Sequence, residues 1–205
     1  IYTLSLHDAL PIFGAYFLIK ENKEELARIM TMEQGKSLTE ARGEIDYAAS
    51  FVRWFAEEAR RIDGDVLTSV KASQKLVVLK QPIGVTAAIT PWNFPSAMIA
   101  RKAAPALAVG CAMIVKPASL TPLSAYALAL LAYEAGVPQD LLPVVSGRAS
   151  EISHEFATNP TVRKISFTGS TEVGAKIFAD SAADIKKLKD RKSTRLNSSH
   201  LELSR

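Results

Sequence analysis

The chain has 205 residues, of which 48% are hydrophobic, 22% charged and 7% aromatic. This composition is typical of one globular domain with a real core, and no apolar run reaches the roughly 18 residues needed to cross a bilayer. A single cysteine, Cys111, excludes an internal disulfide and favours a reducing compartment, so we expect a cytoplasmic protein that does not bind membranes.

The net charge of +4 invites a nucleic-acid interpretation, but the distribution of charge argues against it. Residues 189–205 hold five basic and two acidic side chains, which leaves 20 basic and 19 acidic side chains in the rest of the chain. The positive charge is therefore mostly in a tail, whereas a nucleic-acid site needs a basic face on a folded element. We expect no nucleic-acid partner.

Both ends of the chain differ in character from its middle. Residues 189–205 are mostly polar without a helical or alternating pattern, and residues 1–13 show no continuity with the segment after them. Both resemble translated adapter or vector sequence, although a natural disordered tail is the alternative. We predict a non-native-looking leader at 1–13, a folded domain at 14–188 and a non-native-looking disordered tail at 189–205.

The first elements along the chain are helical. A helix is predicted over residues 20–33, with Gly35 just past its end. Ser37 and Glu40 then form a capping-box pattern. From Leu38 onward, apolar residues recur at steps of three and four, namely Leu38, Ala41, Ile45, Ala48, Val52, Phe55, Ala59 and Ile62. This stripe predicts a long core helix and no chemistry.

After Gly64, short apolar segments alternate with helical ones. Strands are predicted at residues 75–81, 85–90, 112–115, 142–145 and 164–167. Helices are predicted at 96–108, from Pro122 with Thr121 as its cap, at 151–157 and at 171–182. The alternation predicts an α/β fold, a Rossmann-like parallel sheet with flanking helices, whose ligands bind at the carboxyl ends of the strands.

A rigid loop comes directly after the strand at 85–90. Its sequence, Pro-Trp-Asn-Phe-Pro, places Asn93 between two aromatic residues and two prolines. A side-chain amide that is held rigidly can donate a hydrogen bond to a developing oxyanion. Alternatively, Asn93 only satisfies backbone groups of a turn.

Two further strand ends carry candidate cofactor groups. Lys116 comes after the strand at 112–115 and could reach a ribose hydroxyl or phosphate, although a lone lysine is more often solvated. Residues 168–174 come after the strand at 164–167 and open a helix, where backbone N–H groups and the helix dipole suit a pyrophosphate. The segment is neither Gly-x-Gly-x-x-Gly nor a P-loop, so alone it is weak evidence.

Together, residues 89–95 (ITPWNFP), 110–118 (GCAMIVKPA) and 167–174 (FTGSTEVG) resemble, in order and spacing, signatures of the aldehyde dehydrogenase superfamily. The resemblance covers about residues 14–188. Residues 80–90 and 98–102 are most similar to its succinate-semialdehyde dehydrogenases. The resemblance implies a truncated NAD(P)-binding domain of an enzyme that oxidises an aldehyde to a carboxylic acid. It also implies that the full-length protein is a homo-oligomer.

The resemblance also implies roles for single residues. Asn93 would stabilise the oxyanion of a thiohemiacetal, and Lys102 would lie just behind the reacting groups. Arg101 would hold the distal carboxylate of a semialdehyde, which its fork of donors matches, although an ordinary surface arginine is the alternative. The cofactor would be bound by Ile89, Thr90, Pro91, Trp92, Lys116, Ala118, Ser119, Gly147, Phe167, Thr168, Gly169, Ser170 and Val173. No metal site is expected.

Two features bear on the cofactor and on activity. Many NAD-preferring relatives have glutamate at the position of Ser119, where a carboxylate would repel the extra phosphate of NADP, so we expect NADP to be accepted.

The family's Glu-Leu-Gly-Gly segment, expected after Leu188, does not occur in the sequence, and neither does the nucleophilic cysteine. Cys111 lies in an apolar stretch and is expected to be structural. The alternative function is an inactive fragment, at most a dinucleotide-binding module.

Overall fold

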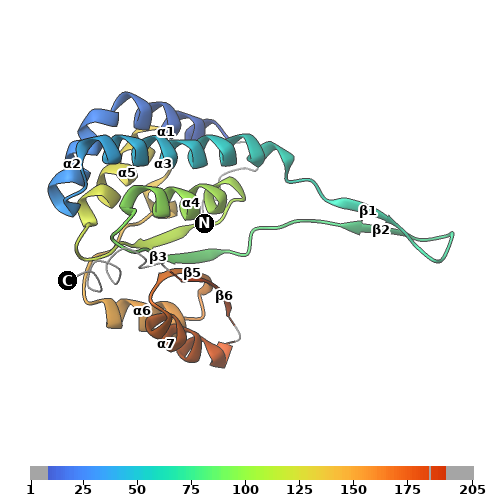
Figure 1. Ribbon diagram of the computed structural model, residues 1–205. Coiled ribbons are helices and arrows are strands. Elements are labelled where there is room, and N and C mark those ends of the chain that lie inside the picture. Colours follow the sequence, from blue (N-terminus) through green and yellow to red (C-terminus); the bar gives the residue numbers. More distant parts are fainter. Residues whose placement is uncertain (1–8, 185, 193–205) are drawn as a thin grey trace, which may run out of the picture.

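A parallel sheet with helices on both faces organises the part of the chain that the computed structural model describes, residues 9–184 and 186–192. Figure 1 shows α1 to α5 on one side of this sheet and α6 and α7 on the other, with a two-stranded ribbon that extends away from both. No helix among the described residues is long and apolar enough to span a membrane.

The fold begins earlier than the sequence predicts. Helix α1 (Leu10–Glu21) buries Ile12, Ala15 and Ile19, which lie on one face at helical spacing. The predicted boundary at residue 14 is therefore wrong, because Leu10–Phe13 form the first turn of this helix. Residues 1–8, to which the rest of the leader prediction applies, lie outside the described residues.

The next helices have the predicted end signals, but the helix predicted over 20–33 begins later, because Lys20 and Glu21 belong to α1. Helix α2 (Lys23–Gln34) ends at Gly35, whose φ of 80° is left-handed, as a glycine allows. Helix α3 (Leu38–Glu58) has the predicted capping box of Ser37 and Glu40, and its buried face includes Ala41, Ile45 and Val52. A short 3-10 helix, η1 (Ala59–Arg61), ends this segment before Ile62.

The predicted strand at 75–81 forms, but outside the parallel sheet. Strand β2 (Lys75–Val78) pairs antiparallel with β1 (Asp65–Thr68), which the sequence did not signal. All eight residues of the ribbon are exposed. The ribbon projects beyond the helical layer (Figure 1), so its apolar side chains contribute nothing to the core.

The parallel sheet has the order β4-β3-β5-β6. Its strands are β3 (Val85–Ile89), β4 (Met113–Lys116), β5 (Val162–Gly169) and β6 (Lys187–Lys192). The predicted strand at 142–145 is reduced to one parallel bridge between Val144 and Val115. Pro143 has no N–H for a longer ladder, although its carbonyl accepts from Val115 N at 2.8 Å. The bridge at Val144 lies beside β4 and adds a fifth position to the sheet. If the five are numbered in chain order from β3, their order across the sheet is 3-2-1-4-5, as in Rossmann sheets.

Strand β6 enters the predicted tail. Its backbone pairs with β5 from Lys187 opposite Lys164 to Lys192 opposite Gly169, so the boundary predicted at 188 is wrong. The reason is that ladder hydrogen bonds join backbone groups, and a polar edge strand can therefore form without an apolar pattern. Residues 193–205 lie outside the described residues.

The remaining helices cover the two faces of the sheet. They are α4 (Pro95–Ala108), α5 (Pro122–Glu134), α6 (Ala149–Thr158) and α7 (Thr171–Ser181), with 3-10 turns η2 (Gln139–Leu141) and η3 (Ala182–Asp184). Neighbouring residues of β3 face opposite ways: Ala88 joins the core under α1 to α5, and Ala87 joins the core with Phe156 of α6 and Ile177 of α7. Burial on both faces explains the short apolar strands.

The prediction that the Thr121 side chain caps α5 is wrong, although its position is right. Thr121 holds the N-cap position of α5 but makes no capping hydrogen bond. The carboxylate of Glu33, at the end of α2, instead accepts from the backbone N–H of Leu123 at 2.7 Å and Ser124 at 2.8 Å. A carboxylate from another helix thus accepts the hydrogen bonds of the free backbone N–H groups in the first turn of α5.

Candidate active site

The three predicted loops lie at one edge of the sheet. Ile89 at the end of β3 is in register with Lys116 on β4 and Phe167 on β5. All three strands are parallel, so the loops after them leave from the same edge. The order of strands reverses between β3 and β5, and ligands of Rossmann sheets bind at this point. The structure therefore brings together the loops that carry Asn93, Ser119 and Ser170.

The Asn93 loop is tied at both ends. Thr90 N donates to the carbonyl of Lys116 at 3.2 Å, and Pro95 opens α4. Between them the carbonyl of Asn93 accepts from Lys36 Nζ at 3.0 Å. Asn93 is half-buried between Trp92 and Phe94, which are both exposed. The backbone that carries the candidate oxyanion donor is therefore fixed from several elements.

Lys116 is not a solvated lysine. It is only 4% exposed, and burial lowers the pKa of its ammonium group. Its Nζ donates to the carbonyl of Pro117 at 2.8 Å and to the hydroxyl of Ser119 at 3.4 Å. No carboxylate among the described residues lies within ion-pair distance of it. A buried cation without an acidic partner suits an anionic ligand at this edge.

The third loop provides a helix N-terminus. Ser170 is the N-cap of α7, and its hydroxyl accepts from Val173 N at 3.4 Å. The amides of Thr171 and Glu172 precede the first intrahelical bond, which runs from Gly174 N to Ser170 O. Val173 in this first turn is exposed, and so is Gly147 in the loop that follows the Val144 bridge. Such a terminus can receive a phosphate group.

Gly169 is required by close packing against Phe167. A Cβ at position 169 would lie 2.5 Å from Cζ of the buried Phe167 ring. We expect Gly169→Ala to lower the free energy of unfolding by about 1–3 kcal/mol, because the ring must move. Urea unfolding of the purified chain measures this. Gly43→Ala on α3, where the new Cβ meets nothing within 4 Å, is the control; an equal loss in both variants would contradict the explanation.

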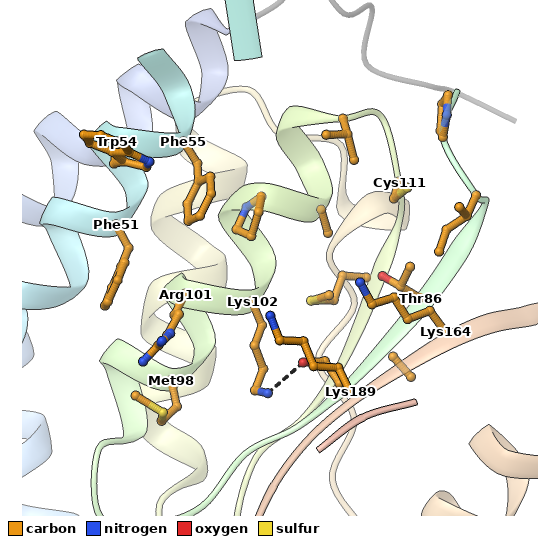
Figure 2. Close-up of a pocket in the computed structure, with 18 of the residues that line it drawn as sticks. Phe51, Trp54, Phe55, Thr86, Met98, Arg101, Lys102, Cys111, Lys164 and Lys189 are labelled. Atoms are coloured by element: carbon orange, nitrogen blue, oxygen red, sulfur yellow. Dashed lines mark hydrogen bonds between the residues drawn. The ribbon is translucent and has the colours of Figure 1, made fainter. Parts of the chain in front are cut away.

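Arg101 and Lys102 lie elsewhere, in a pocket of about 950 Å³ between α3, α4 and the sheet. Figure 2 shows Arg101 and Lys102 on α4, with Phe51 from α3 close to Arg101. The Arg101 guanidinium lies 5.5 Å from the centroid of the Phe51 ring. Lys102 Nζ donates to Ser166 Oγ at 2.8 Å, the dashed line in Figure 2. Thr168, which we predicted to bind the cofactor, also lines this pocket, whereas Asn93 does not.

The charge of this pocket has one sign. Its charged lining residues are Lys80, Arg101, Lys102, Lys164 and Lys189, and no acidic residue is among the described residues that line it. Cys111 lines it as well, as a buried free thiol. No group of three or more potential metal ligands of the His, Cys, Asp and Glu types occurs within the described ranges.

The sequence interpretation missed the residues that fix the Asn93 loop. Glu44 is buried on α3 and pairs with Lys36, which precedes that helix. A signal was present, because Glu44 falls within the apolar stripe between Ala41 and Ala48. A charge on a buried face needs a partner, so the sequence indicates that Glu44 is paired, while the structure identifies Lys36 as the partner.

The strand order and the shared loop edge define a Rossmann-like α/β domain with a ligand-binding edge. Residues 12–190 match the profile of the "Aldehyde dehydrogenase family". The chain belongs to the aldehyde dehydrogenase family.

Three relatives illustrate how close this similarity is. The chain is 60% identical over 171 residues to the glutarate-semialdehyde dehydrogenase of Pseudomonas aeruginosa. The identity is also 60% over 171 residues to the NADP(+)-dependent succinate-semialdehyde dehydrogenase GabD of Escherichia coli K12. A crystal structure described as an E. coli NADP-dependent enzyme superposes with a TM-score of 0.91 at 55% identity, covering 93% of this chain and 40% of that one.

The similarity covers only part of the relatives. The matched segment is 83% of this chain but 35% of the P. aeruginosa enzyme and 36% of the E. coli enzyme. The chain therefore spans about a third of the length of the relatives it matches.

Proposed function

We propose that this chain is the cofactor-binding part of an enzyme that oxidises an aldehyde to a carboxylic acid with NADP or NAD. The observation that carries the proposal is the shared edge of β3, β4 and β5, where the Asn93 loop, buried Lys116 and the start of α7 meet in a member of this family. A nicotinamide cofactor supplies a hydride acceptor when it is bound. Asn93 would donate its amide N–H to the oxyanion that develops on the aldehyde carbon.

The residues at this edge fit a dinucleotide. The Lys116 ammonium group, buried beside Ser119, would contact ribose or phosphate oxygens, and the first amides of α7 would contact phosphate. Ile89, Pro91, Trp92, Ala118, Gly147 and Val173 would complete the cleft. The exposure of Trp92 and Val173 leaves apolar surface for a ligand to cover.

For the substrate we propose succinate semialdehyde, which would be oxidised to succinate. The pocket that holds Arg101 has cationic and apolar lining residues and no acidic one within the described ranges. An aldehyde whose far end is a carboxylate fits this lining better than a neutral or cationic one. The names of the two relatives, a succinate- and a glutarate-semialdehyde dehydrogenase, agree with this substrate class.

The cofactor preference can be tested at Ser119. We expect Ser119→Glu to raise the ratio of KM for NADP to KM for NAD by about tenfold or more, because a carboxylate there repels the extra phosphate. The assay uses a hybrid enzyme, the E. coli relative with its matching segment replaced by residues 12–188 of this chain, so that the relative supplies the family's general-base glutamate and nucleophilic cysteine. Ser73→Glu in the ribbon adds the same charge far from the cleft and should leave the ratio unchanged; equal ratios in all three proteins would refute the role of Ser119.

For the 205-residue chain by itself we propose no aldehyde oxidation, since the family's nucleophilic cysteine and general-base glutamate do not occur in it. Incubation of the purified chain with succinate semialdehyde and NADP should give no NADPH, while calorimetry should still detect NADP binding. NADPH formation above that of a boiled sample would overturn this. Absence of binding would remove the dinucleotide-binding alternative and weaken the assignment of the cleft.

Self-association is a further proposal for the full-length protein. The β1–β2 ribbon exposes Val66, Leu67, Leu76 and Val77, and an exposed ribbon of this kind suits pairing with another subunit. Sedimentation of the hybrid enzyme would determine its oligomeric state. The cytoplasmic location stays a prediction.

A further inference from the structure

We propose that the buried ion pair of Lys36 and Glu44 is a positioning device that holds Asn93 in its catalytic orientation. The inference rests on the proposed function, because only an oxyanion gives the orientation of Asn93 a catalytic meaning. Neither residue is expected to touch the substrate.

Glu44 joins α3 to the first turn of α4. Its Oε1 accepts from the backbone N–H of Ser96 at 2.9 Å and Ala97 at 3.2 Å. Phe94, at the N-cap position of α4, makes no side-chain cap. A carboxylate from a helix more than fifty residues earlier therefore satisfies the donors with which α4 begins, in a favourable position for the helix dipole.

Lys36 extends this connection to the loop. Its Nζ lies 2.5 Å from Glu44 Oε2, 3.0 Å from the carbonyl oxygen of Asn93, and 4.3 Å from the centroid of the Phe94 ring. One ammonium group thus contacts the carboxylate, the Asn93 peptide and the next aromatic side chain. These contacts fix the backbone from which the Asn93 amide extends.

The ion pair of Lys36 and Glu44 is buried, so its loss would disturb the groups around it. The side chains of Lys36 and Glu44 are 11% and 1% exposed. Removal of one member leaves a charge in a poorly solvated place, so the other contacts must rearrange. Capping of α4 needs only Glu44, whereas the bond from Lys36 to the Asn93 carbonyl acts on the loop alone. We therefore assign Lys36 to the loop, and Glu44 both to the cap of α4 and to holding Lys36 in place.

The first test uses the 205-residue chain and does not require activity. In a chain labelled with ¹⁵N-asparagine, Lys36→Met should shift the Asn93 backbone and side-chain amide resonances and speed their hydrogen exchange, while Asn22 and Asn159 keep theirs. The control is Asp46→Ala, which removes two ion pairs, to Lys20 and Lys23, from the same helix α3. Unchanged Asn93 resonances in the Lys36→Met chain would overturn the proposal.

The second test uses the hybrid enzyme. Lys36→Met and Glu44→Gln should lower kcat by about 10- to 100-fold, as expected when a catalytic group is misplaced, with a much smaller change in the Kd for NADP, whose proposed phosphate contacts lie on other loops. Lys36→Arg keeps the charge and should retain more of kcat than Lys36→Met, and Asp46→Ala should keep all of it. A merely structural role would lower the melting temperature of the variants without this split between kcat and Kd.

The two possible failures can be told apart. If the unsubstituted hybrid oxidises succinate semialdehyde and Lys36→Met keeps its kcat, the positioning role is wrong and the proposed function stands. If the unsubstituted hybrid folds and binds NADP but forms no NADPH with any aldehyde, the proposed function fails, and the resonances of Asn93 still decide whether Lys36 orders the loop.

Discussion

Replacement of Asn93 by alanine in the hybrid enzyme is expected to lower kcat by about 10²- to 10³-fold, the usual effect of removing one oxyanion donor. The KM for the aldehyde should change much less, because the amide contacts a charge that develops only during the reaction. Steady-state rates of NADPH formation measure both constants. Pro95 and the contact of Lys36 with the Asn93 carbonyl involve the backbone, so the truncation should leave the loop in place.

Two further variants decide whether donation is the property that matters. Asn93→Asp keeps the shape of the side chain but replaces the amide donor by an acceptor, so it should be at least as slow as Asn93→Ala. Asn22→Ala removes an amide that only bonds the carbonyl of Leu18 at the end of α1, and it should keep full kcat. Asn93→Ala with a kcat within about threefold of the unsubstituted hybrid would show that another group stabilises the oxyanion.

Replacement of Arg101 by methionine should lower kcat/KM for succinate semialdehyde by about 10²-fold, since hydrogen bonds to a charged group contribute about 1.5–3 kcal/mol. For butanal, which has the same chain length and no carboxylate, we expect a change of less than about threefold. The ratio of the two effects isolates recognition of the charge from any general damage to the pocket. Lys102 and Lys164 also line the pocket, so we expect the variant to keep a residual preference for anions.

The control for this prediction is an arginine outside the pocket. Arg60, exposed on η1, is not among the pocket residues, and Arg60→Met should leave both aldehydes unaffected. If Arg101→Met weakens the two substrates equally, then Arg101 supports the pocket through its contact with Phe51 and does not bind the carboxylate. The preference for a semialdehyde would then have to come from other residues.

The sequence predicted most of the sheet and the common edge of the three loops. The capping box at Ser37, the left-handed Gly35 and the alternation of short apolar strands with helices are local patterns, and the structure has each of them. The shared edge of the three loops came from one further fact, that parallel strands present their carboxyl ends on one side. The sequence alone therefore indicated that the loops of Asn93, Lys116 and Ser170 lie at one edge of the sheet.

Features that depend on backbone pairing were harder to predict. Strand β6 runs through the polar sequence after Leu188, and β1 pairs with β2 although none of its residues is buried. In both cases the hydrogen bonds join main-chain groups, which every residue carries, so the side chains leave no periodic signal.

The remaining features were decided only by the tertiary structure. Glu33 caps α5 from α2, Glu44 caps α4 from α3, and Lys36 reaches the Asn93 carbonyl 57 residues away. Local spacing cannot predict such contacts, because they depend on which helix ends meet after the sheet has formed. The sequence thus determined which groups could do chemistry, and the packing of α2 and α3 against α4 and α5 determined how those groups are held.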